Sequence, residues 1–134
     1  MPGIARLVVT AFDTRDPVAL AEFYSALTGW PIERTDEDWV QLQSDGGASL
    51  AFQLAPDHEP PVWPSADRPQ QAHLDLAVPD LDAATARIEA LGGRLLSIDK
   101  DPEGEHRVMA DTEGNEFTIL GPLPQDEAAR IGLA

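Results

Sequence analysis

Cysteine is absent from this chain of 134 residues, and basic side chains are scarce. The absence of cysteine excludes disulfides, thiolate metal sites and a cysteine nucleophile, and it leads us to expect a cytoplasmic protein. Lysine and arginine together number 9 against 24 acidic residues, which gives a formal net charge of −15. A surface of this charge repels phosphate backbones and anionic lipids, so neither nucleic acid nor a membrane is expected as a partner.

Long apolar segments are missing as well. No segment approaches the roughly 18 consecutive apolar residues of a membrane-spanning helix. Residues 1–13 lack the apolar region and the cleavage site of a signal peptide, and they predict a first strand instead. Hydrophobic residues still make up 43% of the chain, which is enough for the core of one compact domain or of two small halves that share a core.

The sequence contains an internal repeat. The segment that begins at Asp16 and ends at Gly29 resembles the segment that begins at Asp80 and ends at Gly93. An aspartate is a favourable N-cap, and a glycine favours the left-handed conformation that closes a helix. Apolar residues recur at helical spacing in both segments, at Leu20, Phe23, Tyr24 and Leu27, and at Leu81, Ala84, Ile88 and Leu91. We therefore predict two amphipathic helices, each packed through one face.

Strand-like segments flank both predicted helices. One precedes each helix and three follow it, at residues 7–13, 30–34, 39–43 and 49–54 in the first half and at residues 73–78, 94–99, 106–110 and 116–120 in the second. Each half is therefore predicted to be a βαβββ module of an α+β fold. We expect modules over residues 1–55 and 71–121, a connector over 56–70 whose five prolines prevent regular structure, and a C-terminal tail over 122–134.

Alternation along the predicted strands separates two faces of each module. The face under the helix is apolar. The opposite face carries polar, small and aromatic side chains, namely Asp13, Trp39, Gln53, His73, Asp75, Glu116 and Thr118. This composition is typical of a ligand-binding cleft, and the alternative is a face that is simply exposed to solvent, as in many antiparallel sheets.

Four segments carry a family resemblance: ALAEFYSALTGW (19–30), SLAFQLA (49–55), HLDLAVPDLDAATARIEALGG (73–93) and ADTEGNEFTIL (110–120). Through them the chain resembles the vicinal oxygen chelate superfamily, which includes glyoxalases, bleomycin-resistance proteins and extradiol dioxygenases, and it is most similar to the glyoxalase-like subgroup. The resemblance implies an open, cup-shaped mixed sheet with the helices outside, and a homodimer. In metal-using members, four cup-facing positions bind a divalent ion that chelates two neighbouring oxygens of the substrate.

Carried over to this chain, the four ligand positions fall on Val9, Gln53, His73 and Thr118. Valine cannot bind a metal and threonine is a poor ligand at neutral pH, whereas a catalytic zinc site normally has three protein ligands. No metal or other cofactor is therefore expected, and His73 and Gln53 would be the ligands if an ion were bound. The alternative role of His73 is a hydrogen bond within the cup, to Gln53, Thr118 or Asp75.

Two functions follow from the resemblance, and the sequence leaves the catalytic residues unassigned. The first is a metal-independent protein that binds a small molecule in the cup and sequesters an antibiotic or another metabolite; an acidic cup suits a cationic drug. The alternative is a lyase, isomerase or dioxygenase that uses a divalent metal with a remodelled ligand set, in which Asp75 or Glu116 joins His73 and Gln53. Trp63 in the connector is expected to act as a lid, as a dimer contact or in structural packing.

Overall fold

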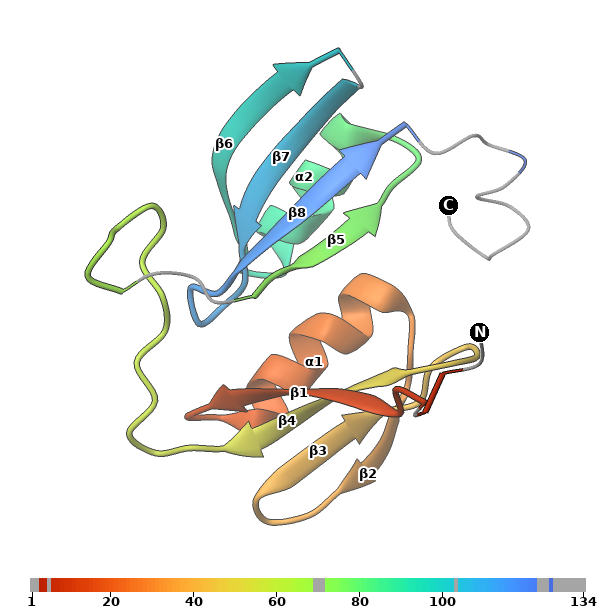
Figure 1. Cartoon of the computed structure of the whole chain (residues 1–134), viewed down its shortest axis with the longest axis vertical. Coiled ribbons are helices and arrows are strands. Elements are labelled where there is room, and N and C mark those ends of the chain that lie inside the picture. The colour runs from red at the N-terminus through yellow and green to blue at the C-terminus, as the bar shows by residue number, and fades with distance from the viewer. Residues whose placement is uncertain (1–2, 5, 69–71, 103, 123–125, 127–134) are drawn as a thin grey trace. The chain divides into compact units, whose positions relative to one another are not determined.

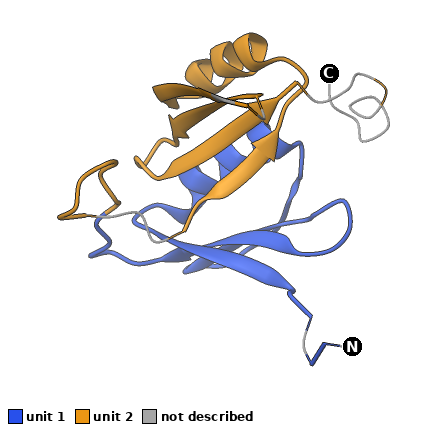
Figure 2. Cartoon of the chain, turned by 45° about the horizontal axis from the view of Figure 1, so that its top comes forward, with its two compact units in different colours: residues 1–59 blue, residues 60–134 orange. Residues whose placement is uncertain are grey.

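A computed structural model describes residues 3–4, 6–68, 72–102, 104–122 and 126 (Figure 1). The chain divides into two compact units, Met1–Glu59 and Pro60–Ala134 (Figure 2). Within the described residues, each unit contains one four-stranded sheet and one helix of several turns. Most of the tail expected over residues 122–134 lies outside the described residues, so that expectation stays a prediction. In the described part of the chain, no helix has both the length and the apolar character needed to cross a membrane.

The first unit has the predicted βαβββ order. Its elements are β1 (Val9–Thr14), α1 (Pro17–Thr28), β2 (Ile32–Thr35), β3 (Trp39–Leu42) and β4 (Ser49–Leu54). The strand order in the sheet is β1-β4-β3-β2, with β1 parallel to β4 and the other neighbours antiparallel. The first strand of the unit therefore lies beside its last strand.

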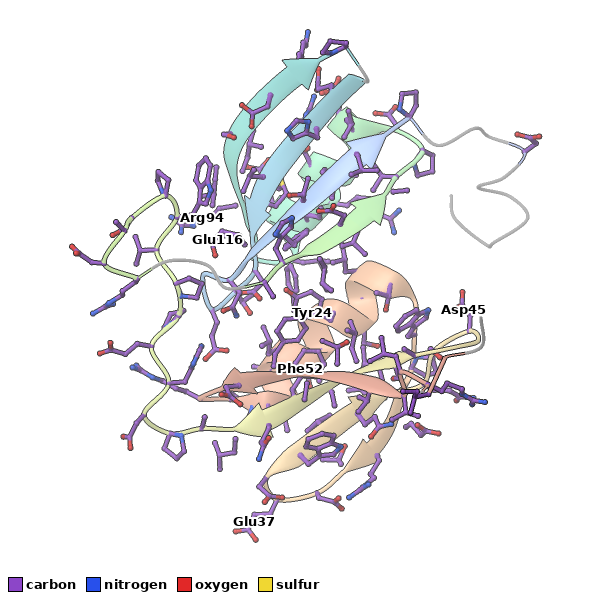
Figure 3. All side chains as sticks on the ribbon, in the orientation of Figure 1. Tyr24, Glu37, Asp45, Phe52, Arg94 and Glu116 are labelled. Carbon is purple, nitrogen blue, oxygen red and sulfur yellow. The ribbon has the colours of Figure 1, made fainter. Side chains whose placement is uncertain are left out.

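Helix α1 begins and ends as the sequence predicts. The side chain of Asp16 accepts a hydrogen bond from the backbone N–H of Ala19 at 3.1 Å, and Gly29 adopts the left-handed conformation with φ of 77°. The buried face of the helix presents Tyr24, whose ring stacks on Phe52 of β4 with the ring centres 5.5 Å apart (Figure 3). Phe12 of β1 stacks on both rings. These aromatic contacts hold the helix on one face of the sheet.

The second unit repeats this order. Its elements are β5 (Leu74–Ala77), α2 (Leu81–Ala90), β6 (Arg94–Asp101), β7 (Gly104–Ala110) and β8 (Glu116–Gly121). The strand order is β5-β8-β7-β6, again with the first and last strands paired in parallel. The predicted α+β fold of two βαβββ modules is confirmed. Strand bounds differ by a few residues from the prediction, and β5 begins at the residue after His73.

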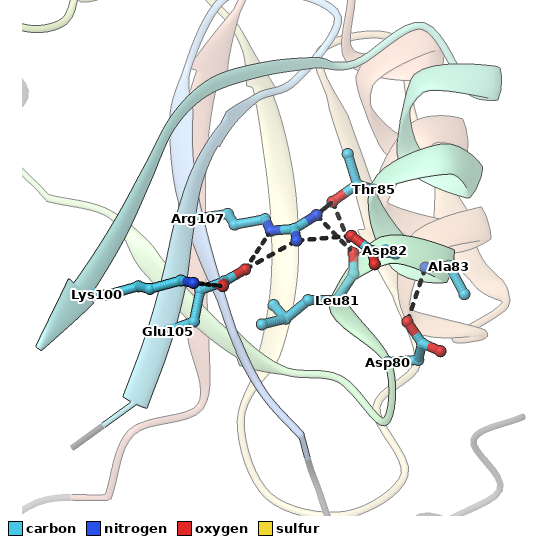
Figure 4. A network of polar contacts seen from close by, with 8 residues as sticks. All are labelled: Asp80, Leu81, Asp82, Ala83, Thr85, Lys100, Glu105 and Arg107. Atoms are coloured by element: carbon cyan, nitrogen blue, oxygen red, sulfur yellow. Dashed lines mark hydrogen bonds and ion pairs between the residues drawn. The ribbon is translucent and has the colours of Figure 1, made fainter. Parts of the chain in front are cut away.

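A buried arginine joins α2 to the sheet (Figure 4). Arg107 of β7 is 8% exposed, and its guanidinium group donates hydrogen bonds to Asp82 at 2.7 Å, to the Thr85 hydroxyl at 2.9 Å and to Glu105 at 2.9 Å. It also donates to the Leu81 carbonyl at 3.3 Å. The hydrogen bonds that Arg107 donates to Asp82 and Glu105 raise the pKa of Arg107, although burial opposes this shift. The network fixes the N-terminal part of α2 on the sheet, because Leu81, Asp82 and Thr85 all belong to this helix.

We predict that Arg107→Met lowers the thermal unfolding midpoint by several degrees. Methionine preserves much of the packing volume but removes every donor, so Glu105 and three oxygens of α2, those of Leu81, Asp82 and Thr85, each lose the guanidinium group as a partner. Lys100→Met is the matched control. The Lys100 side chain is 77% exposed and lies 3.6 Å from Glu105, so its ion pair is expected to contribute little. Equal midpoints for the two variants, measured by circular dichroism, would contradict the prediction.

Candidate functional site

Strand pairing brings several predicted site residues together on the sheet of the second unit. Arg107 contacts α2, so its strand neighbours His106 and Val108 face away from the helix. On this face Asp75 of β5 lies opposite Thr118 of β8, and Thr118 lies opposite Val108 of β7. A cavity of about 590 Å³ lies over this face, lined by Trp63, His73, Asp75, Gly104, Glu105, His106, Val108, Thr118, Leu120, Gly121 and Pro122. Three of the predicted site residues, His73, Asp75 and Thr118, therefore share one cavity.

His73 lies beside a carboxylate. Its Nε2 atom is 3.0 Å from Oδ1 of Asp75, and the two side chains are 40% and 59% exposed. The contact with Asp75 is one of the alternatives that the sequence left open for this histidine. A carboxylate at this distance orients the imidazole ring. The pair therefore places an imidazole and a carboxylate side by side at the cavity.

A second histidine on the same face was not among the residues predicted to form the site. His106 Nε2 lies 3.9 Å from Oδ2 of Asp99 on β6, and the Ser97 hydroxyl donates a hydrogen bond to that carboxylate at 2.9 Å. His106 is the first residue of the strand predicted over residues 106–110. Alternation with the apolar Val108 was the signal that could have placed it on the cavity face.

Glu116, the first residue of β8, is buried close to His73. The pairing of Leu74 with Phe117 puts Glu116 and His73 one residue before that pair, on the same face as Asp75 and Thr118. Glu116 is 5% exposed, and neither of its carboxylate oxygens has a hydrogen-bond partner in another residue. The pKa of this carboxyl is raised, chiefly because burial disfavours its charged form, and the nearby charge of Asp111 adds to the shift. The backbone N–H of Glu116 and the side chain of His73 act in the opposite direction.

Trp63 reaches the cavity from the connector. The connector turns back on itself here, since the backbone N–H of Val62 donates to the Arg68 carbonyl at 2.8 Å and that of Ser65 donates to the Val62 carbonyl at 2.6 Å. The Trp63 side chain lines the cavity, and the residue is 37% exposed. A partly exposed indole at a cavity provides a flat apolar surface for a ligand. Its expected roles as a lid or as a dimer contact stay predictions.

The other predicted site residues form a row on the sheet of the first unit. Gln53 of β4 lies opposite Asp13 of β1 on one side and opposite Trp39 of β3 on the other. The row faces away from α1, because the neighbouring residues Phe12 and Phe52 stack on the helix. Trp39 Nε1 donates a hydrogen bond to Gln41 Oε1 at 3.1 Å, which fixes the indole on this face.

The residues of the chain do not fit the four-ligand metal site of metal-using relatives. Thr10 and Leu74 are equivalent positions of the two repeats, because each lies six residues before the N-cap aspartate of its helix. Thr10 pairs with Leu50, and Leu74 pairs with Phe117. The counterpart of Thr118 is therefore Ala51, which has no ligating atom, and Gln53 lies two residues farther along β4. Among the described residues, no group of three or more His, Cys, Asp or Glu side chains is arranged to hold a metal ion.

A comparison with protein families identifies the family of this chain. The sequence profile of a family described as "Glyoxalase-like domain" matches residues 9–120. The anthracycline biosynthesis protein DnrV of Streptomyces peucetius is 29% identical over 116 residues, which cover 78% of this chain and 42% of the relative. The chain thus spans less than half of that protein.

Solved structures show the same fold. A glyoxalase/bleomycin resistance protein/dioxygenase family enzyme from Burkholderia phytofirmans superposes with a TM-score of 0.66 at 20% identity, over 86% of this chain and 97% of that one. A glyoxalase-related enzyme from Fulvimarina pelagi gives a TM-score of 0.66 at 24% identity, over 87% of each chain. At these identities the similarity establishes the fold alone.

Proposed function

Because this chain belongs to the Glyoxalase-like domain family of the vicinal oxygen chelate superfamily, we propose that it binds a small organic molecule without a metal ion. The observation that carries the proposal is the cavity of the second unit, where the indole of Trp63 lies at the same cavity as the imidazoles of His73 and His106. An apolar surface with a few convergent polar groups is the usual construction of a small-molecule site.

The ligand class that we propose is an antibiotic or another metabolite, held and thereby sequestered. The relative from Streptomyces peucetius is named for anthracycline biosynthesis, and this name supports such a class.

We also propose that the protein acts as a cytoplasmic homodimer. The dimer is supported by the resemblance to the superfamily, and the location by the absence of cysteine.

The first-unit row of Asp13, Trp39 and Gln53 is proposed to contribute to binding of the ligand. Trp39→Ala is therefore expected to weaken ligand binding.

A metal-dependent lyase, isomerase or dioxygenase is the second candidate. The observation that favours it is Glu116, a buried carboxyl close to His73 whose oxygens have no hydrogen-bond partner in another residue. Carboxylate and imidazole are both common ligands of divalent ions. Against it stand the positions of Val9, Ala51 and Thr118, which supply no strong ligand. This candidate needs a ligand set that differs from that of its relatives.

Metal content distinguishes the two candidates. Untagged protein is incubated with nickel, zinc, iron(II) or manganese, dialysed and analysed by mass spectrometry. We expect no retained ion, because two ligand positions of the family carry aliphatic side chains. About one ion per chain after dialysis would favour the enzyme instead, and in that case His73→Ala should abolish the uptake.

Binding itself is tested with a planar aromatic probe. 9-Aminoacridine is fluorescent, cationic at neutral pH and small enough for a cavity of about 590 Å³. We expect saturable quenching of its fluorescence by the wild-type protein. If neither this cation nor acridine-9-carboxylate, which has the same ring and the opposite charge, binds to the wild-type protein, the proposed function is contradicted.

A further inference from the structure

A histidine–aspartate pair occurs twice among the described residues of the cavity face. In the first pair, Nε2 of His73 is 3.0 Å from Oδ1 of Asp75, which is the distance of a direct hydrogen bond. In the second pair, Asp99 of β6 lies opposite His106 of β7, and Nε2 of His106 is 3.9 Å from Oδ2 of Asp99. A distance of 3.9 Å is too long for a direct hydrogen bond. The second pair is therefore open, and a third polar atom can lie within hydrogen-bond distance of both its members.

The open pair of Asp99 and His106 is accessible and held in place. His106 lines the cavity, and the side chains of His106 and Asp99 are 35% and 53% exposed. Asp99 is not one of the lining residues, but its carboxylate lies beside the imidazole that is. The hydroxyl of Ser97 donates a hydrogen bond to Oδ2 of Asp99 at 2.9 Å. Ser97 thus positions the same carboxylate oxygen that faces His106.

The chemistry of the open pair selects the group that binds to it. A carboxylate only accepts hydrogen bonds. An imidazole nitrogen that faces a carboxylate favours the tautomer with its hydrogen on that nitrogen, because two facing acceptors repel each other. A group between them must therefore accept a hydrogen bond from His106 and donate one to Asp99. An ammonium group only donates and a carboxylate only accepts, whereas a hydroxyl group does both.

Resting on the proposed function, we propose that Asp99 and His106 recognise a hydroxyl group of the ligand, and that the ligand is a hydroxylated planar ring compound. The ring is expected to contact Trp63, which lines the same cavity and offers a flat apolar surface. The open pair belongs to β6 and β7, whereas the ligand positions of metal-using relatives include His73 and Thr118. The hydroxyl site is therefore distinct from the position of the metal ion in those relatives.

Two naphthalene probes test for this hydroxyl site. 2-Naphthol and 2-methoxynaphthalene share one ring system and are uncharged at neutral pH, but only 2-naphthol can donate a hydrogen bond. We expect the wild-type protein to bind 2-naphthol about tenfold more tightly, because the methoxy compound cannot donate to the Asp99 carboxylate. Isothermal titration calorimetry with the full-length chain measures both affinities.

Substitutions in the open pair locate the preference for 2-naphthol. Asp99→Ala removes the acceptor, and His106→Phe removes the donor but keeps a planar ring, so each is expected to bring the two affinities within about threefold of each other. Ser97→Ala should reduce the preference by a smaller factor, since Ser97 acts by positioning Asp99. Ile98→Ala is the matched control on the same strand. Ile98 pairs with Arg107, so it lies on the α2 side of the sheet, and it is 50% exposed. Its preference should equal that of the wild-type protein.

The ratio of the two affinities separates recognition from a structural role, because a general loss of binding lowers both affinities alike. Equal affinities of the wild-type protein for the two naphthalenes would overturn the inference, and so would a preference that persists in both Asp99→Ala and His106→Phe. Binding of 9-aminoacridine without binding of 2-naphthol would also overturn it. In that case the proposed function would remain intact, since the two acridine probes test it independently.

Discussion

Trp63→Ala is expected to weaken binding of 9-aminoacridine tenfold or more without a change in the unfolding midpoint. The indole lines the cavity and is 37% exposed, so it provides contact area to a ligand but contributes little to the core. Aromatic side chains of this kind dominate the affinity of binding sites, and a tenfold loss corresponds to about 1.4 kcal/mol. Quenching of the probe measures the affinity, and circular dichroism measures the midpoint.

Trp63→Phe is the matched variant for this experiment. Phenylalanine keeps an aromatic ring at the same position of the connector, and most of the affinity should remain if stacking is the contribution. A loss as large as that of alanine would assign the effect to the indole N–H. Unchanged affinity of both variants would remove Trp63 from the site and leave the residues of the sheet as the binding surface.

Phe52→Ala is expected to have the largest effect on stability, a loss of about 3–5 kcal/mol in the free energy of unfolding. The Phe52 ring is completely buried, and it stacks on Tyr24 of α1 and on Phe12 of β1. A cavity at this position removes the contact of β4 with both elements. Because domains of this size are stable by only about 5–15 kcal/mol, a large part of the stability would be lost.

Urea denaturation followed by circular dichroism measures this loss. Leu54→Ala is the matched control, because Leu54 lies two residues along the same strand on the same face but is 36% exposed. A loss near 1 kcal/mol or less is expected there, since little apolar surface is buried. Similar losses for both variants would show that the aromatic stack does not hold α1 on the sheet.

The elements of the fold were predictable because each has a local signal. Asp16 and Asp80 are the N-caps of the two helices, as their positions before apolar residues at helical spacing predict. Alternation also assigned the faces of the last strand, since Phe117 and Ile119 are fully buried on the helix side. Such signals depend on neighbouring residues alone, and the exact strand bounds, which depend on pairing, differed by a few residues.

The candidate site was less predictable because it depends on pairing between distant residues. Alternation along a strand cannot give the register of β4 against β1. This register makes Ala51, and not Gln53, the counterpart of Thr118. The buried position of Arg107 likewise depends on its contact with Thr85 of α2, 22 residues away in the sequence. The isolation of the Glu116 carboxyl has no sequence signature either, since it reflects which donors are already occupied.

The order of strands in each sheet also has a consequence for synthesis of the chain on the ribosome. Every strand of the first sheet lies between Val9 and Leu54, and within the described residues no strand of one sheet is hydrogen-bonded to the other. The nascent first unit can therefore close its parallel β1–β4 pair before β5 has been translated. Residues of the second unit can then diverge without altering any strand pairing on which the first unit depends, so a new ligand preference can evolve in one half of the chain alone.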